Sequence, residues 1–501
     1  MLEHDPSDRA LLAQVHPADW KNPTPAKKYD LVVIGAGTGG LVTAAGAAGL
    51  GAKVALIERH LMGGDCLNVG CVPSKGLISA ARVWSTARRA AELFAGPAVE
   101  LNAAGDFGAM MSRMRRIRSE LSPIDSAERF RGLGVDVFIG DGAFSDAKTI
   151  SVAGAALRFR KAVIATGARA AAPKIPGLDG VRYLTNESIF DLTTLPPRMV
   201  IVGAGPIGCE LAQCFARFGS QVTLIDKGAR ALSRDDADAA AIIRYALERD
   251  GVTCVMGAEI TGVAQQGAVI AVRSSQQGAA STFDCDALLI AIGRAPNVEG
   301  LGLEQADVAF TARGVTVDAR LCTTNERVYA VGDICSTLQF THAADFQARM
   351  VIQNALFFGR GKASHLVTPW ATYTSPEIAQ VGHTAESAAD AGVAIDTFTV
   401  PLHEVDRARL EGETEGFCRI HVQQGSDTIV GATIVAPNAG DMISEVTLCM
   451  TNGLGLSAIG KTMHPYPTQG EVLRKVADAW RRTKLTPTVK TLFARYFPLL
   501  R

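Results

Sequence analysis

Two copies of one glycine-rich pattern constrain the fold of this chain more than any other feature of its sequence. Each copy reads G-x-G-x-x-G and directly follows an apolar, strand-like run, LVVI in the first copy and MVIV in the second. The glycines are Gly35, Gly37 and Gly40 in the first copy, and Gly203, Gly205 and Gly208 in the second. A helical pattern and a further strand follow each copy, which predicts two β-α-β units that bind dinucleotides.

An acidic residue closes the second strand of each unit, 23 residues after the first glycine of its copy. These acids are Glu58 and Asp226, and in such units the acid accepts hydrogen bonds from a ribose while the glycine turn faces the pyrophosphate. Asp226 favours NADH over NADPH, because a carboxylate repels a 2′-phosphate. Lys227 and Arg230 follow closely and would weaken that preference, so NADPH stays an alternative donor.

Length and composition predict several domains and no strongly charged partner. A chain of 501 residues is too long for one ordinary core. Its 50 basic and 50 acidic residues balance, so no net field draws it to nucleic acid or acidic lipid. The densest basic run, RMRRIR at residues 113–118, is interpreted as a solvated helix face. Residues 31–52 carry no charge, but their seven glycines favour a buried strand and turn over a membrane helix, so no membrane contact is expected.

The first residues and the cysteine usage predict a cytoplasmic protein. Residues 1–28 mix charges of both signs and lack the apolar core of a secretory signal, and they are expected to be disordered or strand-edge-like. The ten cysteines are mostly scattered and do not form a secreted disulfide framework. In a reducing compartment, a disulfide that does form is usually a working one.

The segment GGDCLNVGCVPSK places two cysteines, Cys66 and Cys71, five residues apart. A zinc site would need two more ligands at suitable spacing, and a structural disulfide across so short a loop would stabilise little. A pair that stores electrons needs a redox cofactor nearby, for which the first nucleotide unit provides a place. Pro73 and Ser74 suit the start of a helix, whose dipole would favour the thiolate of Cys71.

This cysteine segment, together with the two glycine patterns in this order, resembles the flavin-containing pyridine nucleotide–disulfide oxidoreductases. The resemblance continues through the segments IATGA, AIGRAPN and VYAVGDI. It implies an α/β fold with two Rossmann-like dinucleotide-binding domains and a C-terminal α+β dimerisation domain. The implied parts are an extension at 1–28, an FAD-binding domain at 29–180 and 298–364, an NAD-binding domain at 181–297, and a dimerisation domain at 365–501.

The resemblance also implies where the cofactors bind. FAD would occupy the first glycine pattern and NADH, or alternatively NADPH, the second. Asp333 would hold the ribityl chain, and Gly142 would contact the adenine through its backbone. Lys75 would lie near flavin N5 with Glu210 as its partner. Further cofactor-binding positions in the shared segments are Thr166, Gly167, Gly293 and Arg294.

By the same resemblance, Cys66 and Cys71 form the redox-active disulfide. Cys71 would face the flavin, and Cys66 would be the exposed thiol that exchanges with the acceptor. Asp65 stands where many relatives carry threonine, and its charge is expected to disfavour the thiolate of Cys66.

The acceptor side departs from the disulfide-reducing members. In those members the dimerisation domain lends a histidine, backed by a glutamate, to the partner subunit, so a homodimer with a shared active site is implied. Here the segment HPYPTQGE aligns Tyr466 with that histidine and Glu471 with the glutamate, while His464 lies two residues earlier. A phenol is a poor base at neutral pH, with a reference pKa about 3.5 units above that of histidine. Glu471 also fits a capping box with Thr468 as N-cap.

A tyrosine at this position resembles mercuric reductase, whose acceptor is a soft metal ion, a good partner for thiolates. That acceptor is favoured, as a substrate, and no resident metal site is predicted. The match is incomplete, because no cysteine pair follows Cys449 and no metal-binding cysteine precedes residue 29. The alternative acceptor is a small disulfide, as in dihydrolipoamide dehydrogenase, with His464 as base. A further alternative is a flavin-bearing docking subunit, for which residues 1–28 are the only candidate module.

Overall fold

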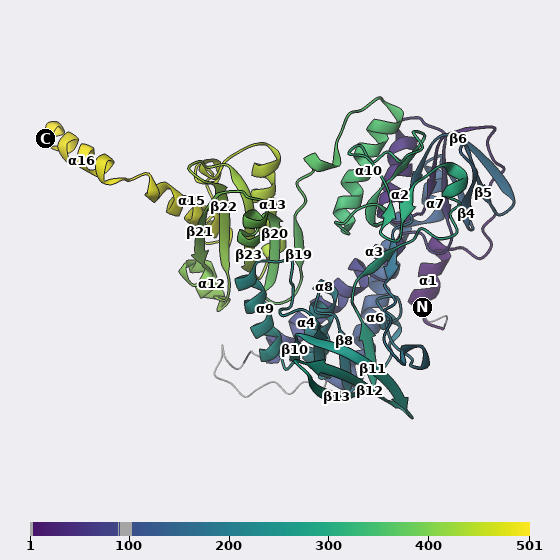
Figure 1. The fold of residues 1–501 in the computed structure, drawn as a ribbon, viewed down its shortest axis with the longest axis horizontal. Coiled ribbons are helices and arrows are strands. Elements are labelled where there is room, and N and C mark those ends of the chain that lie inside the picture. Colours follow the sequence, from purple (N-terminus) through teal and green to yellow (C-terminus); the bar gives the residue numbers. More distant parts are fainter. Residues whose placement is uncertain (1–3, 89, 91–102) are drawn as a thin grey trace. The chain divides into compact units, whose positions relative to one another are not determined.

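The computed structural model describes residues 4–88, 90 and 103–501, and the chain divides into two compact units (Figure 1). The first unit comprises Met1–Lys227 and Ala258–Leu366, and the second comprises Gly228–Gly257 and Val367–Arg501. Parallel sheets with helices fill the first unit, and an antiparallel sheet with helices fills the second. This arrangement confirms the predicted α/β class with two Rossmann-like sheets and a separate α+β unit.

A seven-stranded sheet forms the centre of the first unit. Its parallel strands, in spatial order, are β3 (Asp136–Ile139), β2 (Val54–Glu58), β1 (Tyr29–Ile34), β6 (Ala155–Ile164) and β18 (Val328–Ala330). The first half of β6 also pairs antiparallel with β5 (Thr149–Val152), which pairs with β4 (Gly142–Asp146). Strand β2 reads VALIE and is buried throughout, as expected for a parallel strand covered on both faces.

Helices cover this sheet and carry the segments of interest. Helix α2 follows the first glycine turn and packs so closely on α10 that a Cβ on Gly46 would lie 2.6 Å from Ile352 Cδ1. The described helices of this unit are α1 (Pro6–Val15), α2 (Thr38–Gly49), α3 (Gly64–Asn68), α4 (Cys71–Arg88), α6 (Ala103–Leu121), α7 (Ala127–Gly132), α8 (Pro206–Phe218) and α10 (Thr341–Leu356). Helices α4, α6 and α8 pack against one another.

The second glycine pattern lies in a smaller parallel sheet of the same unit. The strands of this sheet that belong to the first unit are β9 (Gln221–Asp226), β8 (Arg198–Val202) and β14 (Ala287–Ile290), with α8 connecting β8 to β9. Three antiparallel strands precede β14, namely β11 (Ala258–Gln266), β12 (Val269–Gln276) and β13 (Ala279–Cys285). The short strands β7 (Ala168–Ala170) and β15 (Arg294–Pro296) pair antiparallel, as do β16 (Phe310–Thr311) and β17 (Gly314–Val315).

The second unit is built on a five-stranded antiparallel sheet. Its strands, in spatial order, are β19 (Trp370–Thr372), β20 (Glu377–Gly382), β23 (Ile429–Ala436), β22 (Phe417–Gln423) and β21 (Ile395–Pro401). Helices α13 and α15 pack on the sheet and close an apolar core. The helices of this unit, with the strand β10 (Thr253–Met256), are α9 (Ala237–Arg249), α11 (Ala385–Asp390), α12 (Asp406–Glu411), α13 (Ala439–Thr451), α14 (Leu456–Ile459), α15 (Glu471–Thr483) and α16 (Pro487–Tyr496).

The first 28 residues differ from the sequence expectation. Instead of a disordered or strand-edge-like segment, they contain helix α1, whose Leu11 and Val15 are fully buried in the core of the first unit. After the helix, the Trp20 indole donates to Val137 O (3.2 Å), and the Asn22 amide exchanges two hydrogen bonds with the backbone of Ile139. Strand β3 is the edge of its sheet, and this segment covers backbone groups that the edge would otherwise leave unpaired.

The basic run at residues 113–118 also differs from the expectation of a solvated helix face. Arg115 and Arg118 on α6 are buried, and the Arg118 guanidinium lies 2.5 Å from Asp8 Oδ1 on α1. The same guanidinium donates to Asn68 O (2.6 Å), in the segment between the two cysteines. The acid that balances Arg118 lies 110 residues earlier, so the local pattern of charges gave no sign of it.

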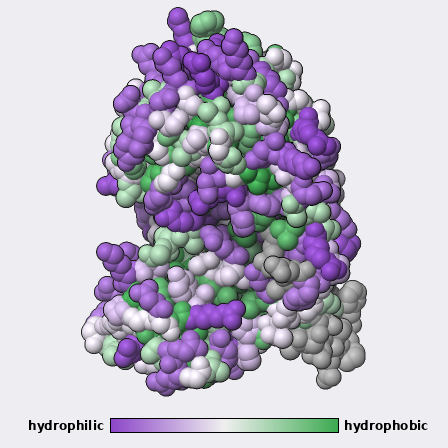
Figure 2. All heavy atoms as spheres, turned by 90° about the vertical axis from the view of Figure 1, so that its right-hand side faces the viewer, coloured by the Kyte–Doolittle hydropathy of each residue, from purple (hydrophilic) through white to green (hydrophobic). Residues whose placement is uncertain are grey.

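Polar side chains dominate the face of the molecule shown in Figure 2, where apolar residues are interspersed rather than gathered into one broad patch. In the described part of the chain, no helix is long and apolar enough to cross a membrane. The uncharged stretch at residues 31–52 forms β1, the glycine turn and α2, as predicted.

Candidate active site

The first glycine turn has a backbone that only glycine permits. Gly35 has φ of +98°, and a Cβ there would lie 2.4 Å from Ala165 O. A Cβ on Gly40 would lie 1.8 Å from Gly35 O, so a side chain at this point would push helix α2 away from the turn. Gly37 is the N-cap of α2, and the free N–H groups of that helix end can receive an anionic group such as a pyrophosphate.

A cavity of about 300 Å³ opens beside this turn, at the carboxyl ends of β1 and β2. It is lined by Ile34, Gly35, Ile57, Glu58, Arg59, Gly140, Asp141, Gly142, Thr166, Asn297, Glu299, Gly300 and Leu301. A Cβ on Gly142 would lie 2.9 Å from Ile57 Cγ2, so only a glycine keeps this wall flat. Carboxyl ends of parallel strands are where such folds bind nucleotides, and this mixed polar and apolar cradle fits the adenosine part of FAD.

The two acids of the nucleotide units make the same contact in both copies. Glu58 Oε2 accepts from Ala36 N at 2.7 Å, and Asp226 Oδ2 accepts from Ala204 N at 2.6 Å. Each acid thus holds the residue between the first two glycines of its own pattern. Burial raises the pKa of the Glu58 carboxyl, and hydrogen bonds from backbone N–H groups oppose that rise. Ribose binding by either acid stays a prediction.

The second glycine turn repeats the geometry of the first. Gly203 has φ of +110°, and a Cβ on it would lie 2.4 Å from Ala291 O. A Cβ on Gly208 would lie 1.8 Å from Gly203 O, as at the matching position of the first turn. Gly205 is the N-cap of α8 and, like Gly37, precedes a helix end with free N–H groups.

Asn297 makes contacts in this region that the sequence did not predict, although the residue lies in the segment AIGRAPN. Its side-chain amide donates to Thr166 O (2.8 Å), while Thr166 Oγ1 donates to Asn297 O (3.0 Å). Its backbone N–H donates to the carbonyl of Gly167, and the carbonyl of Gly293 accepts from Ala171. These hydrogen bonds join the segments IATGA and AIGRAPN beside the cavity.

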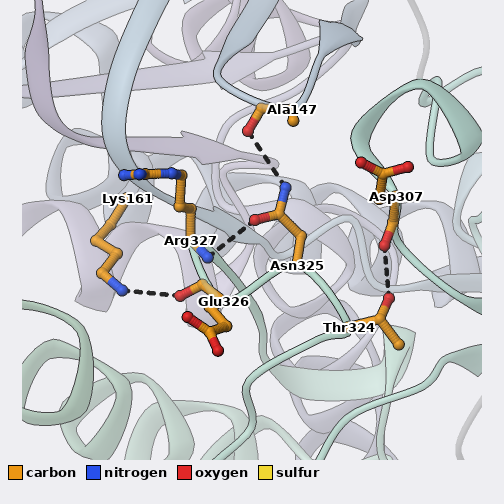
Figure 3. A pocket seen from close by; sticks show the side chains of 7 residues that line it. All are labelled: Ala147, Lys161, Asp307, Thr324, Asn325, Glu326 and Arg327. Carbon is orange, nitrogen blue, oxygen red and sulfur yellow. Dashed lines mark hydrogen bonds between the residues drawn. The ribbon is translucent and has the colours of Figure 1, made fainter.

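A larger hollow of about 420 Å³ lies at the amino end of β18 (Figure 3). Its lining groups are bonded to one another, with the Lys161 ammonium donating to Glu326 O and the Thr324 hydroxyl donating to Asp307 O. It lies at the opposite end of these strands from the glycine turn. The smaller cavity is therefore the better candidate for the cofactor, despite its volume.

The cysteine segment lies against the first glycine turn. Gly64, with φ of +56°, packs so closely there that a Cβ on it would lie 2.6 Å from Gly37 Cα. Cys66 lies on the short helix α3, and Cys71 is the first residue of α4. Both are free thiols, and Cys71, not Cys66 as expected, is the more exposed, because Cys66 lies inside the short helix α3. The expected position of Cys71 at a helix N-terminus is thus what the structure shows.

The groups around the two thiols shift their pKa values in opposite directions. A hydrogen bond from Cys66 lowers the pKa of Cys71, and so do the hydroxyl of Thr341 (3.3 Å from Cys71 Sγ) and the charge of Lys75. The pKa of Cys66 is raised, because it shares that hydrogen bond, is partly buried and faces Asp125. Cys71 is therefore the thiol of the pair that ionises first.

Lys75 and Glu210 form the ion pair that the family resemblance implied, with Lys75 Nζ 2.8 Å from Glu210 Oε2. Lys75 lies one turn after Cys71 on α4, and Glu210 lies on α8 after the second glycine turn. This contact connects the elements of the two predicted nucleotide sites. A role of the pair at flavin N5 stays a prediction.

Replacing Thr341 by valine should raise the pKa of Cys71, because valine keeps the shape but removes the hydroxyl that favours the thiolate. A hydrogen bond to a charged group contributes about 1.5–3 kcal/mol, so the pH at which the reduced protein becomes reactive to iodoacetamide should move upward by about one to two pH units. In the unchanged protein this inflection should lie below the ordinary thiol value. Ser336→Ala, which removes an exposed hydroxyl bonded only to local backbone, should leave the inflection in place.

Asp65 does not act on Cys66 as expected. Its carboxylate forms an ion pair with Arg294, whose Nε also lies 3.3 Å from Asp333 Oδ2. The carboxylate whose charge bears on Cys66 is that of Asp125. Burial raises the pKa of Asp333, and Arg294 partly offsets this effect. Arg294 thus connects the cysteine segment to the residue predicted to hold the ribityl chain.

The predicted acceptor residues lie in the second unit. The Tyr466 hydroxyl is exposed and donates to Asp406 Oδ2 at 3.0 Å, which raises the pKa of the phenol. His464 lies between two acceptors, with Nε2 3.1 Å from Glu445 Oε1 and Nδ1 3.1 Å from Thr462 O. Both ring nitrogens of His464 and the hydroxyl of Tyr466 thus face acceptor oxygens of their own unit.

Glu471 does not form the predicted capping box. Helix α15 begins at Glu471 itself, its N-cap is Gly470, and the Thr468 hydroxyl donates to Pro465 O instead of receiving a helix N–H. Glu471 Oε1 lies 2.7 Å from Arg474. Among the described residues, its buried Oε2 has no hydrogen-bond partner. The helix starts two residues later than the pattern suggested, which leaves this oxygen available for another group.

No group of three or more histidine, cysteine or acidic side chains that could hold a metal ion occurs within residues 4–88, 90 and 103–501.

Two family models match the chain. The model of the pyridine nucleotide-disulphide oxidoreductases matches residues 29–348, and that of their dimerisation domain matches residues 368–477. These ranges contain both glycine turns, the cysteine segment and the predicted acceptor residues.

The individual relatives include more than one type of enzyme. A mercuric reductase of Bacillus cereus is 35% identical over 450 residues, which are 89% of this chain and 70% of the relative. A dihydrolipoyl dehydrogenase of Geobacillus stearothermophilus is 32% identical over 459 residues, 90% of this chain and 96% of the relative. The solved Cu(II) complex of the HOCl-induced flavoprotein disulfide reductase RclA from Escherichia coli has a TM-score of 0.79 and 28% identity, covering 89% of this chain and 99% of that one.

Proposed function

The chain belongs to the pyridine nucleotide-disulphide oxidoreductase family, and from that premise we propose that its Cys66–Cys71 pair delivers electrons from NADH to a soft metal ion. As a family member it is an FAD-dependent oxidoreductase whose electron donor is NAD(P)H. One NADH carries the two electrons that Hg(II) needs to reach the metal, or that two Cu(II) ions need to reach Cu(I). The metal ion is a substrate and does not reside in the protein.

The residues of the first unit would hold the cofactor and poise the thiols. The glycine turn at Gly35, the cavity beside it and Asp333 would bind FAD, which when bound supplies two-electron exchange between the nicotinamide and the thiol pair. The N-terminus of α4, Thr341 and Lys75 would keep Cys71 as a thiolate, and Cys66 would meet the acceptor. Thiolates are soft ligands and bind soft metal ions well.

The observation that favours a metal acceptor is the hydrogen bond of Tyr466 and the pKa that results from it. A disulfide acceptor needs an acid–base group that exchanges protons with the leaving thiol near neutral pH. The Tyr466 phenol donates to Asp406, which raises its pKa further from that range. A metal ion bound by the two sulfurs needs no proton delivered to a leaving thiol, because the proton of Cys66 is released to solvent as the metal binds. The solved relative named for its Cu(II) complex supports the same class of acceptor.

A small disulfide stays the second candidate because of one contact in the second unit. His464 Nε2 lies within 3.2 Å of both Glu445 carboxylate oxygens, and an imidazole oriented by a carboxylate is the usual acid–base device for thiol exchange. The dihydrolipoyl dehydrogenase relative supports this candidate. A docking subunit is disfavoured, since residues 4–28 pack on the chain's own first unit.

We propose NADH as the preferred donor. Asp226 would meet the ribose, and Arg230, one of the two cations that could accept a 2′-phosphate, is already paired with Glu386 at 2.7 Å. We also propose a homodimer, in which the second unit, matched by the dimerisation model, lends Tyr466 and Glu471 to the partner subunit.

A steady-state screen tests these proposals together. The holoenzyme would be assayed with NADH and NADPH against Hg(II), Cu(II), lipoamide and glutathione disulfide, with NAD-linked oxidation of dihydrolipoamide as the reverse assay. The expected result is NADH-driven metal reduction that exceeds every disulfide activity. Dihydrolipoamide oxidation as fast as NADH-driven dye reduction would overturn the metal assignment.

Replacing Tyr466 by histidine should create the disulfide activity that a metal reductase lacks. A positioned acid–base group contributes about 10²–10⁴-fold, so lipoamide reduction should rise by about 100-fold or more. Metal reduction should change little. Tyr466→Phe is the matched control, because it removes the hydroxyl without adding a base, and it should gain nothing. An unchanged lipoamide rate in the histidine variant would show that the base is not the missing part.

A further inference from the structure

Residues 479–501, here called the basic segment, differ in charge from the rest of the chain. All 50 acidic residues lie at or before Asp478, whereas six of the 50 basic residues lie after it. The six are Arg481, Arg482, Lys484, Lys490, Arg495 and Arg501. The chain as a whole is neutral, so this local excess of positive charge did not show in the overall balance.

The basic segment contains a regular helix, α16, that does not pack into a core of the described part of the chain. Helix α16 begins with Pro487 at its first position, and its N-cap, Thr486, accepts from Val489 N. No residue of α16 is buried. In Figure 1 the helix extends away from the antiparallel sheet of its own unit.

The helix has one apolar face. Its large apolar side chains fall at spacings of three and four, so they share one side of the helix. They are Val489, Leu492, Phe493 and Tyr496, and Phe497 and Leu500 continue the row in the following turn. Leu492 and Phe493 are 63% and 42% exposed, and Leu499 and Leu500, just beyond, are 83% and 64% exposed. The rings of Phe493, Tyr496 and Phe497 contact one another at the surface.

The cations lie beside this face. At about 100° per residue, Lys490 lies at one margin of the apolar row, and Arg495 lies toward the opposite margin. Long basic side chains can keep their charge in the polar layer while their stems cover apolar surface. At the start of the segment, Lys484 lies over the ring of Trp480, 5.0 Å from its centroid. Aromatic and basic side chains therefore alternate along the whole segment.

We propose that the basic segment binds the surface of an anionic lipid bilayer. A helix with aromatic and leucine side chains on one face and only basic charge lies in the interface of such a bilayer, with its apolar face below the headgroups. A protein partner or a second copy would also cover the apolar face, but neither explains six cations with no acid among them. The expectation of no membrane contact followed from the net charge of the whole chain, which hides this segment.

Vesicle sedimentation of the full-length holoenzyme tests the proposal. The protein should sediment with vesicles that contain phosphatidylglycerol and should bind phosphatidylcholine vesicles far more weakly. Raising the salt concentration should weaken binding. Lys490→Gln with Arg495→Gln should lower the partition coefficient roughly 25-fold, since each basic residue near an anionic surface contributes about a fivefold factor. Leu492→Ser with Phe493→Ser should lower it by at least roughly tenfold.

Matched controls lie elsewhere on the surface. Arg116→Gln with Arg131→Gln removes two exposed cations of the first unit, and Val83→Ser removes an exposed apolar side chain. These variants should bind vesicles as the unchanged protein does. Absence of wild-type binding to anionic vesicles, or equal binding by the α16 variants, overturns the proposal. So does a change of lipid-free oligomeric mass in the Leu492/Phe493 variant with unaltered vesicle binding, which would assign the face to a second copy.

Discussion

Replacing Cys71 by serine should lower the rate of NADH-driven reduction of the natural acceptor by at least about 10³-fold, which is the usual loss of rate when a catalytic nucleophile is removed. The reason is that the thiol at the N-terminus of α4 is the one whose pKa is lowered, and the thiolate is the reactive form. Serine keeps the size of the side chain and can still accept from Thr341, so the fold should not change. Single-wavelength assays of NADH oxidation with each acceptor of the screen measure the effect.

Two controls accompany this variant. NADH-driven reduction of an artificial dye, which does not need the thiols, should continue in Cys71→Ser and show that the protein is folded and holds its cofactor. Cys254→Ser changes a partly exposed cysteine of β10 outside the predicted site, and it should keep full activity. Cys66→Ser should also lose acceptor reduction, because the pair stores electrons only as two sulfurs. Full-rate turnover by Cys71→Ser would refute the role given to the pair.

Replacing Arg118 by alanine should destabilise the first unit by about 3–5 kcal/mol, because it removes the guanidinium that lies 2.5 Å from the buried Asp8 carboxylate, whereas Arg115 Nε lies farther away, at 4.0 Å. Loss of amide protection in α1, measured by native-state hydrogen exchange, should report this cost directly. The segment around Asn68 should lose protection as well, since its carbonyl accepts from the same guanidinium. Residues 1–28 would thus support the segment between the two cysteines.

The same helix offers a matched control. Arg116 belongs to the same basic run but is exposed and paired only with Glu120, so Arg116→Ala should cost no more than about 0.5 kcal/mol. Replacing both buried partners, with Asp8→Leu and Arg118→Met, should restore much of the stability, because no unpaired charge then stays buried. Equal protection of α1 in Arg118→Ala and in the unchanged protein would contradict this account.

The features that the sequence predicted correctly depend on neighbours along the chain. The glycine turns follow from Gly35 and Gly203, where a side chain would collide with a backbone carbonyl, and the pattern of spacing shows this directly. The start of α4 at Cys71 follows from the local cysteine–proline–serine order. The sequence predicts these turns and this helix start because the same local interactions require the same residues wherever such a turn occurs.

The features that were missed depend on partners far apart in the chain. Thr341 lies 270 residues from Cys71, and no local signal marks a threonine at a helix start as a partner of that thiol. From its place beside Cys66 in the sequence, Asp65 is expected to disfavour the thiolate of that cysteine. In the structure its charge is balanced by Arg294, 229 residues later. In the same way, the sequence predicts a solvated Arg118 because its ion-pair partner, Asp8, is distant along the chain. Charge and hydrogen bonding are set by packing, which the order of residues reveals only in part.

The most direct test of the central claim is an anaerobic titration of the holoenzyme with NADH, followed by absorption spectroscopy. The claim is that Cys71 stays a thiolate against the cofactor in the reduced protein. It predicts a long-wavelength charge-transfer band that grows with NADH, is lost in Cys71→Ser and persists below the ordinary pKa of a thiol. Absence of the band from the unchanged protein, or its survival in Cys71→Ser, would contradict the claim.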